Sequence, residues 1–301
     1  RALLARPNLT NIAVRLLDGT IFERSVQAVN QQFEKQPLLK ARLLQTLADT
    51  MTHLGLTERA AAPQADALAI RRKELGDENA DTVESMGAAA DLFRLQGRLD
   101  LAAPLFEEAY ATSRRVLGNE HLVTLAAINN LGALRQAQGK TEEAEKLQRE
   151  GVELSRKLRG ESHPDVAGAM SNLAFTLGER NQIDEAVKLM QDALAIRKRE
   201  QGEDHPDTLE AVNNLGFMLV DASRAPEAER LFREALEGRR RILGDDHPST
   251  ITMINNIGSA LRAQGKAVDA ESYFRQSLEA RRRVLGSDHP DTLLAVGNLG
   301  V

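Results

Sequence analysis

Apolar residues recur along the chain at the three- and four-residue spacing of amphipathic helices, and short polar breaks separate one such segment from the next. In residues 205–241, one apolar stripe predicts a first helix, and a second stripe predicts another helix after the break at 222–224. The apolar positions of the two stripes are Leu209, Val212, Leu215, Leu219, Leu231, Phe232, Ala235 and Leu236. This part of the chain is therefore expected to form a helical hairpin.

The same pattern returns at a fixed step of 42 residues, and each copy carries a loop glycine, a histidine and an asparagine at matching places. The glycines are Gly76, Gly118, Gly160, Gly202, Gly244 and Gly286, and the histidines are His121, His163, His205, His247 and His289. The asparagines are Asn130, Asn172, Asn214, Asn256 and Asn298. A fixed period of this length is the signature of a solenoid, in which stability comes from stacking between neighbouring units. The predicted fold class is an all-α solenoid of tandem helical hairpins.

The register of the repeat predicts the organisation of the chain. Full units are expected at 79–115, 121–157, 163–199, 205–241 and 247–283. A degenerate copy at about 37–73 precedes them, and a final first helix over 290–301 has no partner helix. We therefore expect lead-in helices over 1–36 and one solenoid of about six repeats over 37–301. The chain starts at Arg and stops inside a motif, so it is expected to be a fragment of a longer protein.

Composition narrows the function classes. The 301 residues are 42% hydrophobic and only 3% aromatic, which suits a helical protein rich in Leu and Ala. The formal net charge of −5 argues against a dedicated nucleic-acid partner, which would usually require a basic protein. Cysteine is absent, which excludes disulfides and thiolate chemistry, and no apolar run is long enough to span a membrane. A cytoplasmic protein without a cofactor is the expectation.

Two strings carry a family resemblance, namely NNLGALRQAQGKTEEAEKLQREGVEL and NNIGSALRAQGKAVDAESYFRQSLEA. Their order of small and large residues resembles the tetratricopeptide repeat. The 42-residue step, the LGxxHPxT loop and the NNLG string are similar to the kinesin-light-chain subclass, whose step exceeds the usual one by about eight residues. This resemblance covers residues 37–301. It implies a right-handed superhelix that binds extended peptides or partner proteins in a concave groove lined by the first helices.

A second resemblance concerns residues 36–56, which are similar to the entry into repeat regions of multidomain bacterial proteins. Some of those proteins carry a Ser/Thr kinase domain upstream. This chain contains no Gly-rich phosphate loop, His-Arg-Asp string or Asp-Phe-Gly string, so any kinase chemistry would lie outside it. The leading interpretation is a non-catalytic interaction scaffold. The alternatives are a regulatory or oligomerisation module of a signalling enzyme, such as a kinase, and a purely structural spacer.

The helical wheel predicts which residues face the groove. In residues 205–241, the side opposite the core carries Glu210, Asn214, Phe217 and Asp221. Asparagine recurs at the position of Asn214 in the other units, and an amide that both donates and accepts can pair with any peptide backbone. In related repeats, this Asn holds the ligand backbone. The predicted ligand-binding asparagines are Asn130, Asn172, Asn214, Asn256 and Asn298, with Asn213 and Asn255 nearer the groove edge. The alternative is that these amides bond the neighbouring repeat.

Aromatic and acidic residues complete the predicted groove. Phe175 and Phe217 lie one repeat apart on this face, either as anchors for a ligand side chain or packed against the adjacent repeat. The acids of this face are Asp49, Glu84, Asp91, Glu179, Glu210 and Asp221, against the single base Arg42. A neutral or basic peptide is therefore expected. This departs from the basic groove of kinesin light chains, which accepts acidic motifs.

The remaining candidate sites have structural interpretations. The periodic histidines lack the spacing of metal ligands and are expected to be loop or cap residues, so no metal is predicted. The basic runs, such as Arg239-Arg240-Arg241, are expected to form a solvated rim neutralised by nearby acids. No catalytic constellation is present, so an enzyme is not expected. The last helix should expose Leu293, Val296 and Leu299 and could associate end to end with a second copy.

Overall fold

The computed structural model describes residues 21–299, and within that range it contains helices and no strands. The helices are α2 (Glu23–Gln32), α3 (Pro37–His53), α4 (Thr57–Leu75), α5 (Ala80–Leu95), α6 (Leu99–Val116), α7 (Leu122–Ala137), α8 (Thr141–Arg159), α9 (Pro164–Glu179), α10 (Ile183–Gln201), α11 (Pro206–Asp221), α12 (Ala225–Leu243), α13 (Pro248–Ala263), α14 (Ala267–Leu285) and α15 (Pro290–Leu299). The predicted all-α class is confirmed. The part of the expected lead-in over 1–20 and the end of the last helix at 300–301 lie outside the described residues.

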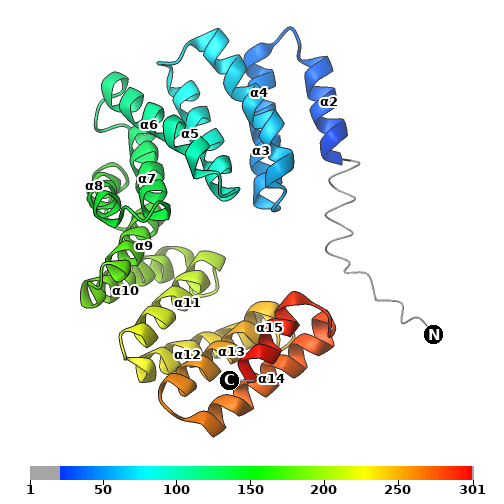
Figure 1. Cartoon of the computed structure of the whole chain (residues 1–301), viewed down its shortest axis with the longest axis vertical. Coiled ribbons are helices and arrows are strands. Elements are labelled where there is room, and N and C mark those ends of the chain that lie inside the picture. Colours follow the sequence, from blue (N-terminus) through cyan, green and yellow to red (C-terminus); the bar gives the residue numbers. More distant parts are fainter. Residues whose placement is uncertain (1–20, 300–301) are drawn as a thin grey trace, which may run out of the picture. The chain divides into compact units, whose positions relative to one another are not determined.

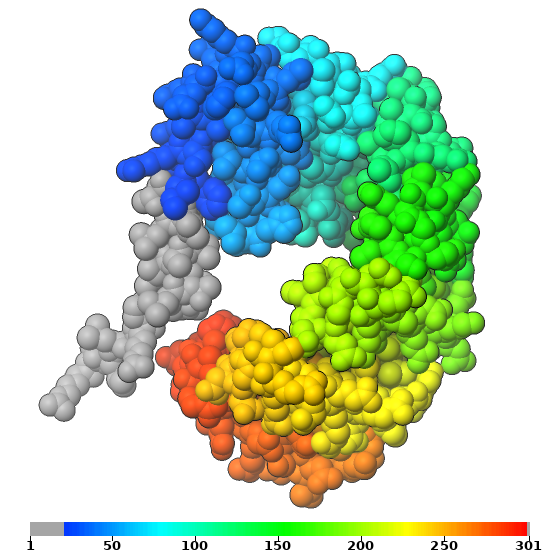
Figure 2. Space-filling model, turned by 180° about the vertical axis from the view of Figure 1, so that it is seen from behind, coloured from blue at the N-terminus to red at the C-terminus, as the bar shows by residue number. Residues whose placement is uncertain are grey.

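The helices group into two compact units, and the boundary falls inside α8, between Leu154 and Ser155. In the first unit, α3 to α7 pack against one another in chain order, each helix on its predecessor (Figure 1). In the second unit, α9 to α15 follow the same rule. Figure 2 shows each unit as a continuous band of successive colours, as expected where every hairpin is covered by its sequence neighbours.

From α5 onward, each first helix begins at a residue whose side chain caps the backbone. Nδ1 of His163 accepts the N–H of Asp165 at 3.1 Å, and Nδ1 of His205 accepts that of Asp207 at 3.2 Å. The same contact recurs at His121, His247 and His289. A cap of this kind satisfies one of the N–H groups that a helix start leaves without a partner. The prediction that these histidines are structural caps is confirmed.

The two helices of a hairpin meet where a small residue faces a large one. In the second unit, a Cβ added to Gly216 of α11 would collide with the ring of Phe232 of α12, which is completely buried. Gly258 and Phe274 repeat this pairing in α13 and α14. The missing Cβ thus lets an aromatic ring lie directly on the backbone of the first helix.

One basic residue lies in the interior. Arg239 of α12 is only 2% exposed, and its guanidinium donates to the carbonyl of Leu209 at 3.2 Å and to that of Ser249 at 2.9 Å. It therefore joins α12 to both neighbouring first helices, and burial lowers its pKa to about 10. The predicted solvated rim is wrong for Arg239, although its exposed neighbour Arg240 does pair with Asp245 at 2.9 Å.

Candidate binding face on the first helices

The exposed positions of α9 and α11 that lie opposite their buried residues form a surface that we call the first-helix face. Its residues are Asn172, Phe175, Glu179, Glu210, Phe217 and Asp221, all of them exposed. They recur at spacings of three, four and seven residues, which place them on one side of each helix. All four predicted contacts other than asparagine therefore reach solvent together with Asn172, namely Phe175, Phe217, Glu210 and Asp221.

Four of the predicted asparagines bond to one another instead of facing solvent alone. The amide nitrogen of Asn256 donates to Oδ1 of Asn213 at 3.1 Å, which joins α13 to α11. The amide nitrogen of Asn298 donates to Oδ1 of Asn255 at 2.9 Å, which joins α15 to α13. Asn256 is only 3% exposed. For these four asparagines, the structure therefore agrees with the alternative to ligand binding, in which the amides bond the neighbouring repeat and tie consecutive first helices together.

The other asparagines differ in exposure. Asn130 and Asn214 are half-buried. The amide nitrogen of Asn130 would lie 3.3 Å from a Cβ at Gly87, so this side chain packs over α5. Asn172 is exposed, and Asn129, which by the 43-residue step would be its partner, lies against Gly151 of α8 instead. Among the asparagines that the sequence singles out, Asn172 has the greatest access to a ligand.

The sequence left open whether the two phenylalanines are exposed to a ligand or packed against other residues, and the structure shows both exposure and packing. Phe175 is 38% exposed and Phe217 is 46% exposed, which are large fractions for aromatic side chains. Phe217 also packs edge-on against Phe232, with ring centroids 5.8 Å apart and planes at 62°. This contact fixes the ring of Phe217 while its outer side stays open to solvent. A ring held in this way can meet an apolar ligand group with little loss of entropy.

The predicted acids of the groove are divided between the two units. In the second unit, Glu179, Glu210 and Asp221 lie on the first-helix face beside the phenylalanines. In the first unit, Nε of Arg94 donates to Asp91 at 2.8 Å and offsets its charge. Asp49 is partly desolvated by burial, which raises the pKa of its carboxyl group. Asp91 therefore contributes less negative potential than the sequence suggested, whereas Glu84, the third predicted acid of the first unit, is exposed.

A comparison of two alanine variants separates the structural asparagines from the exposed one. We expect Asn256→Ala to lower the free energy of unfolding by about 1–2 kcal/mol, because it leaves the half-buried carbonyl of Asn213 without its donor. Asn172→Ala should change it by less than about 0.5 kcal/mol, as is usual at exposed sites. Urea unfolding followed by circular dichroism measures both values. Equal effects of the two substitutions would contradict the distinction between them.

Other classes of site find no support in the part of the chain that the structure describes. Residues 21–299 contain no group of three or more His, Asp or Glu side chains placed to hold a metal ion. No helix in that range has the length and apolar character needed to cross a membrane.

Sequence analysis did miss a pocket between α10, α11 and α12. Its one signal in the sequence is Gly238, which stands where α4 and α10 carry Ile70 and Ile196.

Comparison with known proteins agrees with this architecture. The family model described as tetratricopeptide repeat matches six overlapping stretches, residues 40–115, 81–157, 123–199, 165–238, 207–282 and 249–301. No curated protein matches the chain in sequence.

Solved structures with the same fold include a Podosopora anserina protein named for the kinesin light chain, with nearly identical TPR-like repeats. It is 24% identical over 69% of this chain and 99% of its own, with a TM-score of 0.66. BtubC (BKLC) from P. vanneervenii is 19% identical over 90% of this chain and 94% of its own, with a TM-score of 0.60. The apo form of RapI is 14% identical over 92% of this chain and 97% of its own, also with a TM-score of 0.60. At these identities the likeness concerns the fold.

Proposed function

Because this chain belongs to the tetratricopeptide repeat family, we propose that it is a protein-interaction scaffold that holds an extended peptide or a partner protein on its first-helix face. The observation that carries the proposal is the exposure of Phe175 and Phe217 at equivalent positions of consecutive first helices. Exposed aromatic side chains that recur on one surface are typical of an interaction site.

The chemistry of the face favours a partner of a particular kind. Apolar side chains of the ligand would pack on the rings of Phe175 and Phe217. Glu210 and Asp221 flank Phe217 on α11 at spacings of seven and four residues, so a cation would be attracted to either side of that ring. The amide of Asn172 offers both a donor and an acceptor to the ligand backbone. A neutral or basic segment that alternates apolar with Lys or Arg side chains meets these requirements.

Rigidity of the repeats supports the same role. The first helices α5, α11 and α13 each pack between two second helices, and the asparagine pair Asn213–Asn256 ties α11 to α13. The scaffold therefore loses little conformational freedom on binding, and the ordering cost falls mainly on the peptide.

Selection from a random peptide library tests the proposal. A phage-displayed library of 12-residue peptides is panned on the chain, and affinities of the enriched peptides are measured by fluorescence anisotropy. We expect enrichment of apolar residues next to Lys or Arg. We expect Phe175→Ala with Phe217→Ala to weaken binding about ten- to a hundredfold, because aromatic anchors carry a large share of interface energy.

The control for this experiment is Val268→Ala. Val268 on α14 is 83% exposed and lies outside the first-helix face, so its truncation removes exposed apolar surface at an unrelated place. Its affinity should equal that of the unmodified chain. The proposal fails if no peptide is enriched, or if the double phenylalanine variant keeps its helicity and binds as tightly as the control.

A further inference from the structure

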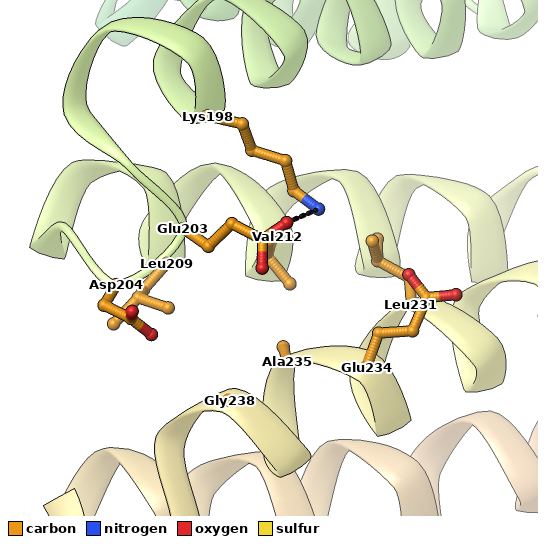
Figure 3. A pocket seen from close by; sticks show the side chains of 9 residues that line it. All are labelled: Lys198, Glu203, Asp204, Leu209, Val212, Leu231, Glu234, Ala235 and Gly238. Carbon is orange, nitrogen blue, oxygen red and sulfur yellow. Dashed lines mark hydrogen bonds and ion pairs between the residues drawn. The ribbon is translucent and has the colours of Figure 1, made fainter. Parts of the chain in front are cut away.

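A pocket of about 200 Å³ lies on the other side of α11 from the first-helix face, between α10 and α12 (Figure 3). Its floor is apolar and consists of Leu209 and Val212 from α11 with Leu231 and Ala235 from α12. Its rim is charged and consists of Lys198, Glu203, Asp204 and Glu234. The pocket thus combines an apolar base with an opening that carries three acids and one base.

One wall of the pocket is formed by a glycine. The other second helices carry a side chain at the position of Gly238, namely Ile70, Thr112, Leu154, Ile196 and Ala280. A Cβ at Gly238 would lie 3.6 Å from a carboxylate oxygen of Asp204, so this carboxylate lies directly over the gap. The opening is therefore a local departure from the repeat pattern.

The charges of the rim do not cancel. Nζ of Lys198 lies 3.5 Å from Glu203, so these two groups offset each other. Asp204 has no ion-pair partner within residues 21–299. Within the same residues, Glu234 forms an ion pair only with Arg230, at 3.9 Å, and both of these side chains are mostly exposed. Two carboxylates on opposite sides of the pocket are thus left to receive a cation (Figure 3).

Neighbouring hairpins show which cation suits this position. Among the acids equivalent to Asp204, Glu78 and Asp246 each pair with an arginine of the second helix that follows, Arg115 and Arg283. The equivalent arginine here is Arg241, and it does not pair with Asp204 in the structure. In this loop geometry, an acid at the site of Asp204 accepts a guanidinium twice elsewhere in the chain.

We propose that the pocket binds an arginine side chain presented by a partner protein. The methylene stem would pack on Leu209, Val212 and Leu231, and the guanidinium would lie between the carboxylates of Asp204 and Glu234. Arginine suits this combination, because its planar fork offers five donors and is weakly hydrated, and its stem buries well against apolar surface. This second site is independent of the first-helix face and would add a contact on the opposite side of α11.

Methyl NMR on the whole chain tests the site with a defined probe. The methyl groups of Leu209, Val212 and Leu231 report on the floor, and Nα-acetylarginine N-methylamide is the ligand. We expect saturable shifts of these methyl signals at low salt. The citrulline analogue has the same shape without the charge and should bind at least fivefold more weakly. Equal binding of the two probes, or no shift with either, would overturn the proposal.

Variants locate the binding and identify the source of its specificity. Asp204→Asn with Glu234→Gln changes only exposed side chains, and it should reduce arginine binding to the level of citrulline. Gly238→Ile should abolish the shifts by filling the pocket, and the double carboxylate variant tests the site if the larger side chain impairs folding. The lysine analogue should bind more weakly than arginine; equal or tighter binding would reject the assignment to a guanidinium.

The chain's own arginine is the internal competitor. If Arg241 occupies the pocket in solution, Arg241→Gln will bind the arginine probe at least threefold more tightly than the unmodified chain, and the proposal of a partner's arginine is then overturned. We expect no such gain.

Discussion

Arg239→Ala is expected to lower the free energy of unfolding by about 3 kcal/mol, the largest effect that we anticipate from a single substitution in this chain. The substitution empties the space of a completely buried side chain and leaves the carbonyl groups of Leu209 and Ser249 without their donor. Both losses act on the same three helices, because Arg239 joins α12 to α11 and α13. Urea unfolding followed by circular dichroism gives the value.

The neighbouring residue provides the matched control. Arg240 is exposed and pairs with Asp245 at the surface, so Arg240→Ala should cost less than about 0.5 kcal/mol. A similar loss at both positions would show that Arg239 does not act as an interior link.

The pKa of Arg239 predicts how the effect of Arg239→Ala on stability depends on pH. Burial lowers this pKa to about 10, which still leaves the guanidinium charged in the folded and the unfolded chain at pH 6 and at pH 9. The difference between Arg239→Ala and the unmodified chain should therefore be the same at these two pH values. Above pH 10, the folded chain releases this proton before the unfolded chain does, so stability from this group rises with pH. A marked change between pH 6 and pH 9 would contradict this assignment.

Gly216→Ala is expected to lower the free energy of unfolding by about 2 kcal/mol, because the added methyl group collides with the buried ring of Phe232. Ala90 and Phe106 occupy the equivalent positions of α5 and α6, so a hairpin can be spaced to admit this pair. The cost is therefore that of shifting α11 from α12, and a complete loss of folding is not expected. Thermal and urea unfolding measure it.

A second substitution should restore the stability. In the preceding hairpin, the corresponding residues are Ala174 and Met190, both completely buried. Gly216→Ala combined with Phe232→Met recreates that pair, and we expect it to regain most of the lost free energy, since methionine adapts its shape to the space left. Gly178→Ala is the control, because a Cβ there meets no atom within 4 Å, and it should stabilise α9 by a few tenths to about 1 kcal/mol. A double variant no more stable than Gly216→Ala would contradict the packing argument.

The sequence by itself determined the class of fold and the position of nearly every helix. The 42-residue step, the two apolar stripes in each unit and the capping histidines are local features, and each acts within a few residues of itself. Local propensity, caps and periodicity all favour the same hairpin, so the pattern was sufficient. The exposure of Phe175, Phe217, Glu210 and Asp221 also followed from the helical wheel.

Only the tertiary structure decided which of several equivalent residues are accessible. Asn172 and Asn256 occupy the same place in the repeat, yet Asn172 is exposed and Asn256 is buried, because Asn213 bonds to Asn256 whereas Asn129, its counterpart, lies against Gly151. Arg239 lies in the core while Arg240, the next residue, is solvated. The pocket beside Gly238 depends on side chains from three helices. A periodic sequence repeats positions, but burial depends on the particular neighbours that each repeat places around them.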